Sequence, residues 1–416
     1  MPTPLQKNRV WLSGGVSEPA SDGSGDYVYY VRSGDGRRAI VRQHLDCGLV
    51  QTLTAEPRPS ATVGYGGGTF GVRGDVLVYA AGRRLVAVDL RTGQQSPITP
   101  EYEGVAVPAL SPDGGFVAFV IEQDGHAEVL LTDTQGAHLP VKLSCSPAFA
   151  ANPTISSDGH HVAWMEWDAN RMPWDQSRLQ IACLSRPSDV AGAPADMLPL
   201  SLATLSKPNV SYANPQFSPD GSHLAYTSDE SGWRSLYLAD PDGHHGERVD
   251  TGLGEIGAPD WSQGQFAVRW GASGEHLYCV RRYRSTARLL KVSASERKVA
   301  ELDSQLTAFG DVAVLPGQPE MLGYVGSAPT MSPCLVTRVE ETETVRASGA
   351  VGLNDPDGLI SSEVVEWPTV DGTTIYGVLY RAASSEAPRP LLVSIHGGPT
   401  SESSNGWNPQ AQYFAG

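Results

Sequence analysis

A turn near the end of the chain contains residue types that could take part in catalysis. The tetrapeptide His-Gly-Gly-Pro, residues 396–399, follows a short apolar run, 391–395, that is typical of a strand buried in a mostly parallel sheet. Two adjacent glycines let the backbone bend and bring its N–H groups close to a ligand, because no Cβ stands in the way. Such N–H groups could stabilise the oxyanion that forms when a carbonyl carbon is attacked. The alternative is an ordinary Gly-Pro turn after a strand.

The other groups that acyl transfer needs are not found in these 416 residues. The sequence has no Gly-x-Ser-x-Gly, the pattern that exposes a nucleophilic serine between a strand and a helix. His396 is the last histidine, so the order serine, acid, histidine cannot be completed after the turn. We therefore expect the entrance to a catalytic domain, and we expect this chain alone to be inactive.

The elements before this turn repeat along the chain. Four turns rich in Ser, Pro, Asp and Gly each precede an alternating strand and begin about 45 to 60 residues apart, at 111–114, 156–159, 218–221 and 271–274. Pro fixes φ, Asp accepts backbone hydrogen bonds and Gly tolerates a positive φ, so these residues suit tight turns. Further strands are predicted at 128–132, 179–184, 235–239 and 287–292, and less regular copies at 27–54, 76–98 and 306–339. The period predicts a β-propeller of seven blades, with eight blades as the alternative, whereas a β-sandwich would not explain the repeated turn.

The pattern changes after the repeats. Residues 346–362 are mostly small or polar and are typical of a linker. Two alternating runs, 363–369 and 374–380, flank an Asp-Gly turn and predict a β-hairpin. We therefore expect a mainly β chain in three parts: a propeller over 1–345, a linker over 346–362, and the first strands of a second, α/β-type domain over 363–416.

Composition limits the classes of partner. Thirty basic against 46 acidic residues give a formal net charge of −16, which argues against nucleic acid and anionic membranes as partners, since both need clustered Lys and Arg.

The first ten residues lack the apolar core of a signal peptide, and no run of 18 apolar residues is present. Five widely spaced cysteines without Cys-x-x-Cys spacing predict buried free thiols, with neither a metal site nor disulfides. The cytoplasm is the expected location.

Several short stretches follow one another in an order that is specific as a set: Tyr65-Gly66-Gly67-Gly68, Trp167-Asp168 before Met172-Pro173-Trp174-Asp175, Phe217-Ser218-Pro219-Asp220-Gly221 before Ser228 to Trp233, Trp367-Pro368-Thr369 with Asp371-Gly372, His396 to Thr400, and Trp407-Asn408-Pro409 with Gln412-Tyr413-Phe414. On these residues the chain resembles the prolyl oligopeptidase (S9) family of serine peptidases, in its acylaminoacyl-peptidase and dipeptidyl-peptidase-like branch. Ser-Pro-Asp-Gly blades alone also occur in non-enzymatic TolB-like propellers. The resemblance covers nearly the whole chain but only the beginning of the family's hydrolase domain.

The resemblance implies a seven-bladed propeller followed by an α/β-hydrolase domain, which is incomplete here. Gly398 would supply one backbone N–H of the oxyanion hole and Gly397 the shape of the turn, while the second donor would follow the nucleophile, outside this sequence. His396 would be structural and not the triad base. Trp174 and Asp175 would line the mouth of the propeller, where substrate enters. The alternative is that Trp174 packs between blades and Asp175 caps a turn.

Three functions are compatible with these features. The first is the N-terminal part of a cytosolic serine oligopeptidase that hydrolyses short peptides by acyl transfer, with the propeller gating access. The second is a non-catalytic propeller that binds peptides or partner proteins, and the third is a related esterase or lipase, because a fold does not fix a substrate. We expect no cofactor and no metal, and a homo-oligomer stays open. Gly64 stands where the branch usually has Glu, so a role of that carboxylate in reading substrate amino ends does not carry over.

Overall fold

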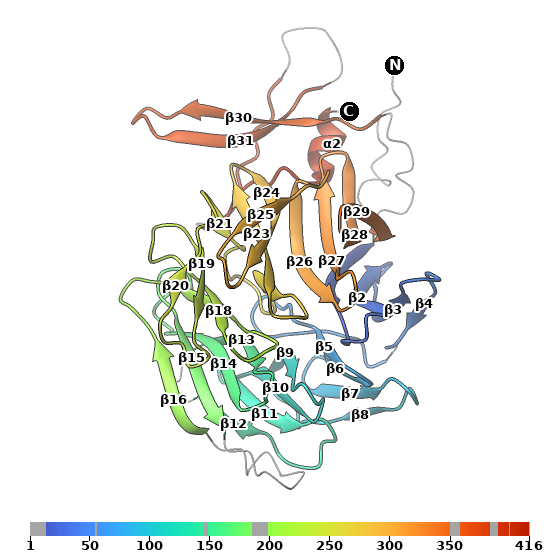
Figure 1. Cartoon of the computed structure of the whole chain (residues 1–416). Helices are drawn as coiled ribbons and strands as arrows, with labels where there is room; N and C mark the ends of the chain where they lie inside the picture. Colours follow the sequence, from blue (N-terminus) through green and yellow to red (C-terminus); the bar gives the residue numbers. More distant parts are fainter. Residues whose placement is uncertain are drawn as a thin grey trace.

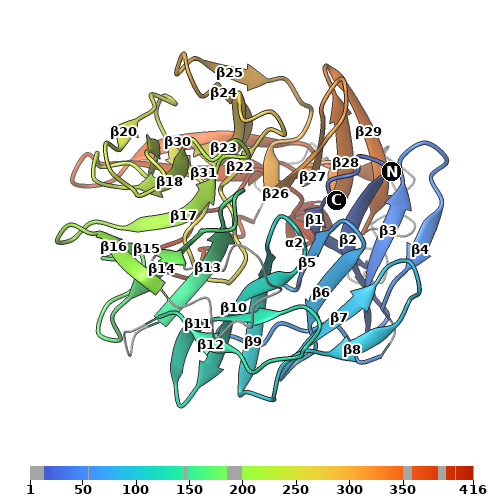
Figure 2. The ribbon, with the colours of Figure 1, turned by 60° about the horizontal axis from the view of Figure 1, so that its bottom comes forward.

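The computed structural model describes residues 14–54, 56–144, 149–184, 199–349, 358–382, 390–398 and 400–415. Within these residues, seven antiparallel sheets stand in a ring, as the blades of a propeller (Figures 1 and 2). In each blade the strands follow one another in sequence, and the first strand lies nearest the centre of the ring (Figure 2). The predicted propeller is confirmed, with seven blades rather than eight.

The first four blades each have four strands. Their bounds are β1 (Gly15–Ala20), β2 (Tyr27–Gly34), β3 (Arg37–His44) and β4 (Val50–Thr52); β5 (Phe70–Arg73), β6 (Val76–Ala80), β7 (Leu85–Asp89) and β8 (Gln95–Pro97); β9 (Gly104–Leu110), β10 (Phe116–Gln123), β11 (His126–Asp133) and β12 (Val141–Lys142); and β13 (Phe149–Ile155), β14 (His161–Trp167), β15 (Arg178–Leu184) and β16 (Pro199–Leu205).

The last three blades include one whose inner strand is divided. Blade five consists of β17 (Tyr212–Phe217), β18 (Leu224–Ser228), β19 (Ser235–Ala239) and β20 (Glu247–Arg248). Blade six consists of β21 (Glu255–Ile256), β22 (Val268–Trp270), β23 (His276–Tyr283), β24 (Thr286–Ser293) and β25 (Val299–Leu302), with β21 and β22 both paired to β23. Blade seven consists of β26 (Ala308–Leu315), β27 (Met321–Ala328), β28 (Met331–Val339) and β29 (Thr342–Ser348), so its last strand continues beyond the expected boundary at residue 345.

Among the described residues, the ring closes by packing and not by a strand shared between the first and last blades. One buried cluster joins Val16 and Tyr30 of blade one to Leu315 and Leu335 of blade seven. Burying a side chain of this size contributes about 1.5–3 kcal/mol. The seam is therefore an apolar interface of the same kind as those between the other blades.

The repeated Ser-Pro-Asp-Gly turn has a local cause. Ser111 Oγ donates to Asp113 Oδ1 at 2.5 Å and accepts the N–H of Phe116 at 2.9 Å, while Asp113 Oδ1 accepts the N–H of Gly115 at 3.0 Å. Gly114 has a φ of 70°, which a residue with a Cβ rarely adopts. The same serine and aspartate hydrogen bonds recur in the turns of blades four and five. The repeat is thus a self-contained connection between the first and second strands of a blade.

A second repeated feature was not predicted from the sequence. The innermost strands of blades one, three, four and five each contain a bulge, where a residue with positive φ precedes a proline: Glu18, Val107, Asn152 and Asn214. A bulge can hold a proline, because the ladder hydrogen bond is already interrupted there. In blades four and five the bulged residues are asparagines, whose side chains reach the segment between β21 and β22.

Residues after the propeller form a hairpin and a short helix beyond one face of the ring (Figure 1). The hairpin, β30 (Ser362–Pro368) and β31 (Thr374–Tyr380), confirms the one predicted. The helix α2 (Pro409–Ala415) begins after Asn408, whose Oδ1 accepts the N–H of Ala411 at 3.0 Å. Asn before Pro is a favoured helix start, since the cap satisfies a free N–H and Pro lacks one.

Two sequence expectations are corrected by the structure. Residues 391–395 form no strand and are not buried: Leu391 and Ile395 are 76% and 86% exposed. Their apolar side chains have no neighbouring strands among the described residues. The expectation of buried thiols holds for Cys279 and Cys334 but not for Cys47, which is exposed, while Cys145 lies outside the described residues. Burial raises the pKa of the Cys279 thiol to about 12.

Candidate functional site

The turn with the two glycines lies next to the propeller face on which the second and third strands of each blade are connected. Beyond the turn, Asn405 N donates to Ser285 O at 2.6 Å, and Trp407 N donates to Ser327 Oγ at 3.2 Å. Arg282 and Glu402 add an ion pair at 3.6 Å. Residues 402–407 are thus held on blades six and seven, a few residues after the turn.

Gly397 and Gly398 are exposed in the structure. A Cβ at Gly397 would meet nothing within 4 Å, whereas a Cβ at Gly398 would lie 3.1 Å from Thr400 N. Among the described residues, no acceptor pairs with the N–H of Gly398. His396 Nδ1 lies 2.8 Å from the carbonyl oxygen of Gly397, a local contact within the turn. Pro399 lies outside the described residues, so the structure describes three of the four predicted turn residues.

Three aromatic side chains gather below this turn. The ring centroids of Trp174 and Trp261 are 4.3 Å apart, and Tyr65 approaches Trp261 edge-on at 6.1 Å. Trp261 Nε1 donates to the carbonyl oxygen of Thr400 at 2.8 Å. Tyr65 is 80% exposed, so this aromatic cluster of Tyr65, Trp174 and Trp261 includes one ring that is open to solvent. Such rings offer large apolar contact area at a low cost in side-chain entropy.

The two predicted substrate-binding residues, Trp174 and Asp175, lie in different surroundings. Trp174 is half-buried and packs on Trp261, which belongs to blade six, whereas Trp174 lies in the β14–β15 connection of blade four. Asp175 is exposed, and its N–H donates to Met172 O at 3.0 Å in a local turn. The tryptophan therefore belongs to the aromatic cluster, and the aspartate is not brought into it. A substrate-binding role for either residue stays a prediction.

The glycines after Tyr65 allow two backbones to meet. A Cβ at Gly67 would lie 2.1 Å from the carbonyl oxygen of Gln263, and one at Gly68 would lie 3.1 Å from Gly264 Cα. Gln263 N donates to Gly66 O at 2.8 Å. Only residues without a side chain permit this approach, so the Tyr-Gly-Gly-Gly stretch packs directly on the segment that carries Trp261.

Gly64, which stands where the related branch usually has Glu, contacts a carboxylate from another blade. Its N–H donates to Glu122 Oε2 at 3.0 Å. Glu122 lies near the end of β10 in blade three. A carboxylate therefore does lie beside the Tyr65 loop, although it comes from another part of the chain than the family pattern leads one to expect.

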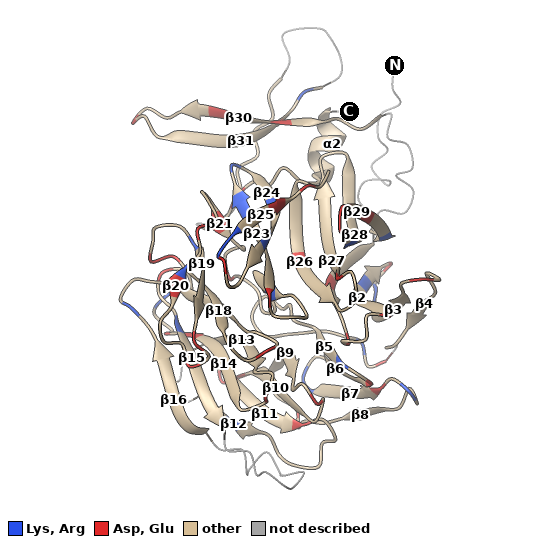
Figure 3. Cartoon of the chain, in the orientation of Figure 1, with Lys and Arg blue, Asp and Glu red and all other residues tan. Residues whose placement is uncertain are grey.

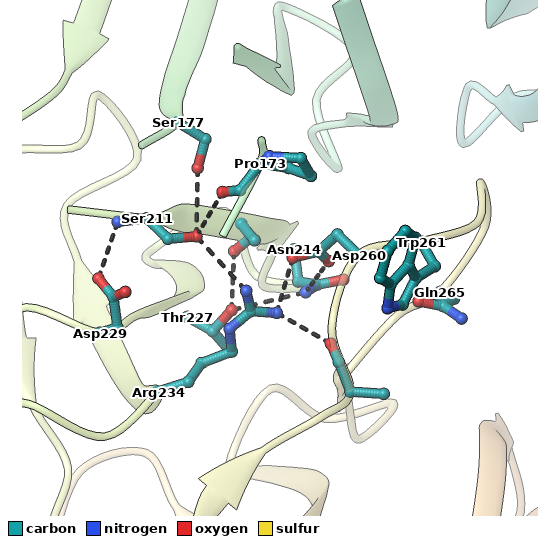
Figure 4. A network of polar contacts seen from close by, with 12 residues as sticks. Pro173, Ser177, Ser211, Asn214, Thr227, Asp229, Arg234, Asp260, Trp261 and Gln265 are labelled. Carbon is teal, nitrogen blue, oxygen red and sulfur yellow. Dashed lines mark hydrogen bonds and ion pairs between the residues drawn. The ribbon is translucent and has the colours of Figure 1, made fainter. Parts of the chain in front are cut away.

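A buried polar network next to Trp261 joins the loops that carry Trp174 and Trp261 (Figure 4). Arg234 Nη1 lies 2.7 Å from Asp260 Oδ2, with the two side chains only 8% and 3% exposed. Arg234 also donates to Ala258 O at 2.9 Å and to Ser211 Oγ at 3.4 Å. Ser211 Oγ in turn donates to Pro173 O at 2.9 Å. Desolvating such a pair is costly, and the additional hydrogen bonds offset part of that cost.

Two residues of this network lie next to Trp174 and Trp261 in the sequence. Pro173 precedes Trp174 and Asp260 precedes Trp261, so Arg234 fixes the backbone next to both tryptophans. Asn214 Nδ2, from the bulge of blade five, donates to Asp260 Oδ1 at 3.3 Å. Sequence reasoning missed Arg234 and Asp260, because no motif or spacing links a residue before β19 to one in the interrupted strand of blade six.

A second group of charges lies half-buried on the innermost strands of blades six and seven, with Arg269 in β22 and Asp311 in β26. Burial raises the pKa of the Asp311 carboxyl to about 6, while the neighbouring Arg269 acts in the opposite direction. Burial also lowers the pKa of Arg269 to about 10. The Arg269 guanidinium lies 4.0 Å from the ring centre of Phe266, and its Nε donates to Val312 O at 3.1 Å. The pKa of Asp311 therefore depends on how closely the inner strands of blades six and seven pack around it.

Other charges are spread over the ribbon rather than gathered on one side (Figure 3). Within the described ranges, no group of three or more His, Cys, Asp or Glu side chains is placed to hold a metal ion. No helix in the part of the chain that the structure describes is long and apolar enough to cross a membrane.

Comparisons with known proteins extend these observations. No family model matches the sequence, and neither does any curated protein. Among solved structures, a puromycin-hydrolyzing peptidase of Mycobacterium tuberculosis is 20% identical with a TM-score of 0.85, over 100% of this chain and 66% of that one. A puromycin hydrolase is 22% identical with a TM-score of 0.83, over 99% of this chain and 67% of that one. A structure from a study of two prolyl endopeptidases is 14% identical with a TM-score of 0.64, over 91% of this chain and 56% of that one.

At these identities the comparisons establish the fold. The chain spans less than two thirds of the length of the first of these structures. The structural neighbours of this chain are puromycin hydrolases and prolyl endopeptidases, and it shares their propeller fold.

Proposed function

We propose that this chain is the propeller-bearing part of a cytoplasmic serine hydrolase of the prolyl oligopeptidase type, which acts on short peptides or aminoacyl compounds. The observation that carries the proposal is the position of the Gly397–Gly398 turn over the propeller face, fixed next to the aromatic cluster by Thr400. The names of the structural neighbours, puromycin hydrolases and prolyl endopeptidases, support the same class of reaction.

The exposed apolar run before the turn supports a continuation of the catalytic domain. Leu392 and Val393 are each 68% exposed, and a strand with unpaired backbone groups and apolar faces is prone to aggregate. A parallel sheet contributed by further residues of the same protein would cover both faces and pair the backbone. The two domains would then enclose the turn, and the propeller would admit only substrates small enough to reach it.

In this proposal the chemistry is acyl transfer. A serine Oγ attacks the substrate carbonyl and passes its proton to a histidine, which then protonates the leaving amine, and water releases the acyl group by the same route in reverse. The role of the present chain is electrostatic: the N–H of Gly398 would donate to the oxyanion, an interaction worth about 3–4 kcal/mol in the transition state. The aromatic cluster would contact the substrate's apolar groups.

Fluorophosphonate labelling of the product of the native gene, followed by size on a gel, tests this function. Fluorophosphonates react with an activated serine, and the 416 residues contain no Gly-x-Ser-x-Gly pattern. A labelled band well above 44.2 kDa is the expected result. A product of 44.2 kDa that never labels would contradict it, and the chain would then be a propeller that binds peptides or partner proteins.

A further inference from the structure

One hydrogen bond connects the glycine turn to the propeller. Trp261 Nε1 donates to the carbonyl oxygen of Thr400 at 2.8 Å, two residues after Gly398. Among the described residues of 390–400, Thr400 makes the only hydrogen bond to the propeller. The turn folds tightly on this residue, since a Cβ at Gly398 would lie 3.1 Å from Thr400 N. A shift of Thr400 would therefore move the N–H of Gly398.

The donor is itself held from several sides. The ring of Trp261 packs on Trp174 at 4.3 Å and on Tyr65 at 6.1 Å, and the backbone N–H of Trp261 donates to Pro259 O at 2.8 Å. Asp260, the preceding residue, is held by the buried Arg234 (Figure 4). The indole is thus a fixed donor on a rigid part of the propeller.

We propose that Trp261 is a positioning residue for the oxyanion hole: it fixes the far end of the Gly397–Gly398 turn from the propeller side, and Arg234 and Asp260 hold it in place. This inference rests on the proposed function. The sheet of the catalytic domain would fix the near end of the turn, up to Ile395, and Trp261 would fix the other end. Each domain thus supplies one anchor, so the oxyanion hole takes its shape only when the two domains are together.

Accurate placement is what gives such a contact an effect on rate. Oxyanion donors act from preorganised positions, and a misplacement of about 1 Å costs about 100-fold in rate. Residues 391–398 are exposed and, among the described residues, make no other hydrogen bond to the propeller, so the turn has little else to fix its far end. Loss of the Trp261 bond is therefore expected to lower kcat about 10- to 100-fold with little change in KM.

The test compares two tryptophans that make the same kind of bond in different places. Trp261→Phe removes the indole N–H and keeps an apolar ring for Trp174 to pack against. Trp270→Phe is the matched control, because Trp270 Nε1 donates to a backbone carbonyl, Gln216 O, at 3.0 Å, within the propeller and away from the turn. Asp260→Asn is a third variant, which disturbs Trp261 without altering its ring.

Two readouts separate this inference from the proposed function. In the present chain, Trp261→Phe should raise deuterium uptake in residues 400–405, and Trp270→Phe should not. In the product of the intact gene, Trp261→Phe and Asp260→Asn should lower kcat and the rate of fluorophosphonate labelling, with Trp270→Phe close to the unmodified enzyme.

Four results would overturn the inference. Equal deuterium uptake in residues 400–405 of both tryptophan variants would show that the contact does not hold the turn. Equal kcat in an active enzyme would show that it does not position the oxyanion hole, and a raised KM with unchanged kcat would assign Trp261 to substrate binding instead. An unmodified gene product that neither labels nor hydrolyses peptides would overturn the proposed function and the positioning role with it.

Discussion

The propeller and the region after it contain similar apolar residues, which are buried in the propeller and exposed after residue 390. In the propeller, strand side chains such as Tyr79, Phe119 and Trp164 are fully buried, because each blade covers the next around the ring. After residue 390 an equally apolar run is exposed, since the described residues contain no sheet for it to join. Apolar sequence therefore specifies burial only where the same chain supplies the covering surface.

The largest expected effect is a difference in local stability between these two regions. Backbone amides of β27 should exchange only with global unfolding, residues 400–407 should exchange at an intermediate rate, and residues 391–395 within seconds. The order follows from burial in the propeller, from a few hydrogen bonds to blades six and seven, and from exposure with no partner strand. Hydrogen exchange read by mass spectrometry measures all three.

Limited proteolysis sharpens the same comparison. We expect a stable core that corresponds to the propeller, ending near Ser348, and early cleavage in residues 391–395. A protease-resistant core that keeps residues 391–398 would contradict the distinction between the two regions, because it would mean that the exposed run is covered in solution.

The next largest effect concerns the buried ion pair that supports the aromatic cluster. Asp260→Asn should lower the free energy of unfolding of the propeller by about 3–5 kcal/mol, because it leaves the Arg234 guanidinium buried without its counter-ion. Chemical denaturation measures this change. Lys207→Met is the control: it removes an ion pair with Glu230 of the same 2.7 Å length, but Lys207 is exposed and solvent already screens the pair. Equal destabilisation by the two substitutions would refute the importance of burial here.

The sequence predicted those parts of the molecule whose cause is local. The Ser111 turn is formed by hydrogen bonds among residues 111–116, and the hairpin by an Asp-Gly turn between two alternating strands, so both are visible as patterns. The Arg234–Asp260 pair joins residues that are brought together only by the interrupted strand of blade six and the bulge at Asn214. No local pattern encodes that meeting.

The same reasoning applies to the site. Trp174 was singled out by its motif, but its partner Trp261 was not, because the two approach each other from different blades. That residues 391–395 form no strand was not predicted either, since a paired strand and an unpaired one have the same sequence. In both cases the local sequence pattern does not reveal which other part of the protein packs against the residues.

A smaller effect is expected from pH, again within the propeller and not in the region after it. Asp311 has a pKa raised by burial from 3.8 to about 6, so the folded protein holds a proton there that the unfolded chain has lost. Only well below pH 3.8 are both states protonated, and there the carboxyl adds no pH dependence. As the pH rises to 7, the folded state must lose the proton too, and the free energy of unfolding should fall by about 2–3 kcal/mol.

Comparing Asp311→Asn with the unmodified chain isolates this contribution. The variant cannot titrate at this position, so its free energy of unfolding should fall less between pH 4 and pH 7, whatever its absolute stability next to Arg269. Asp46→Asn, at an exposed position, controls for the loss of one negative charge. Denaturant titrations at a series of pH values give the difference. If the two variants showed the same pH dependence, Asp311 would titrate as an exposed carboxyl, and the centre of the ring would be open to water rather than closed by the packing of blades six and seven.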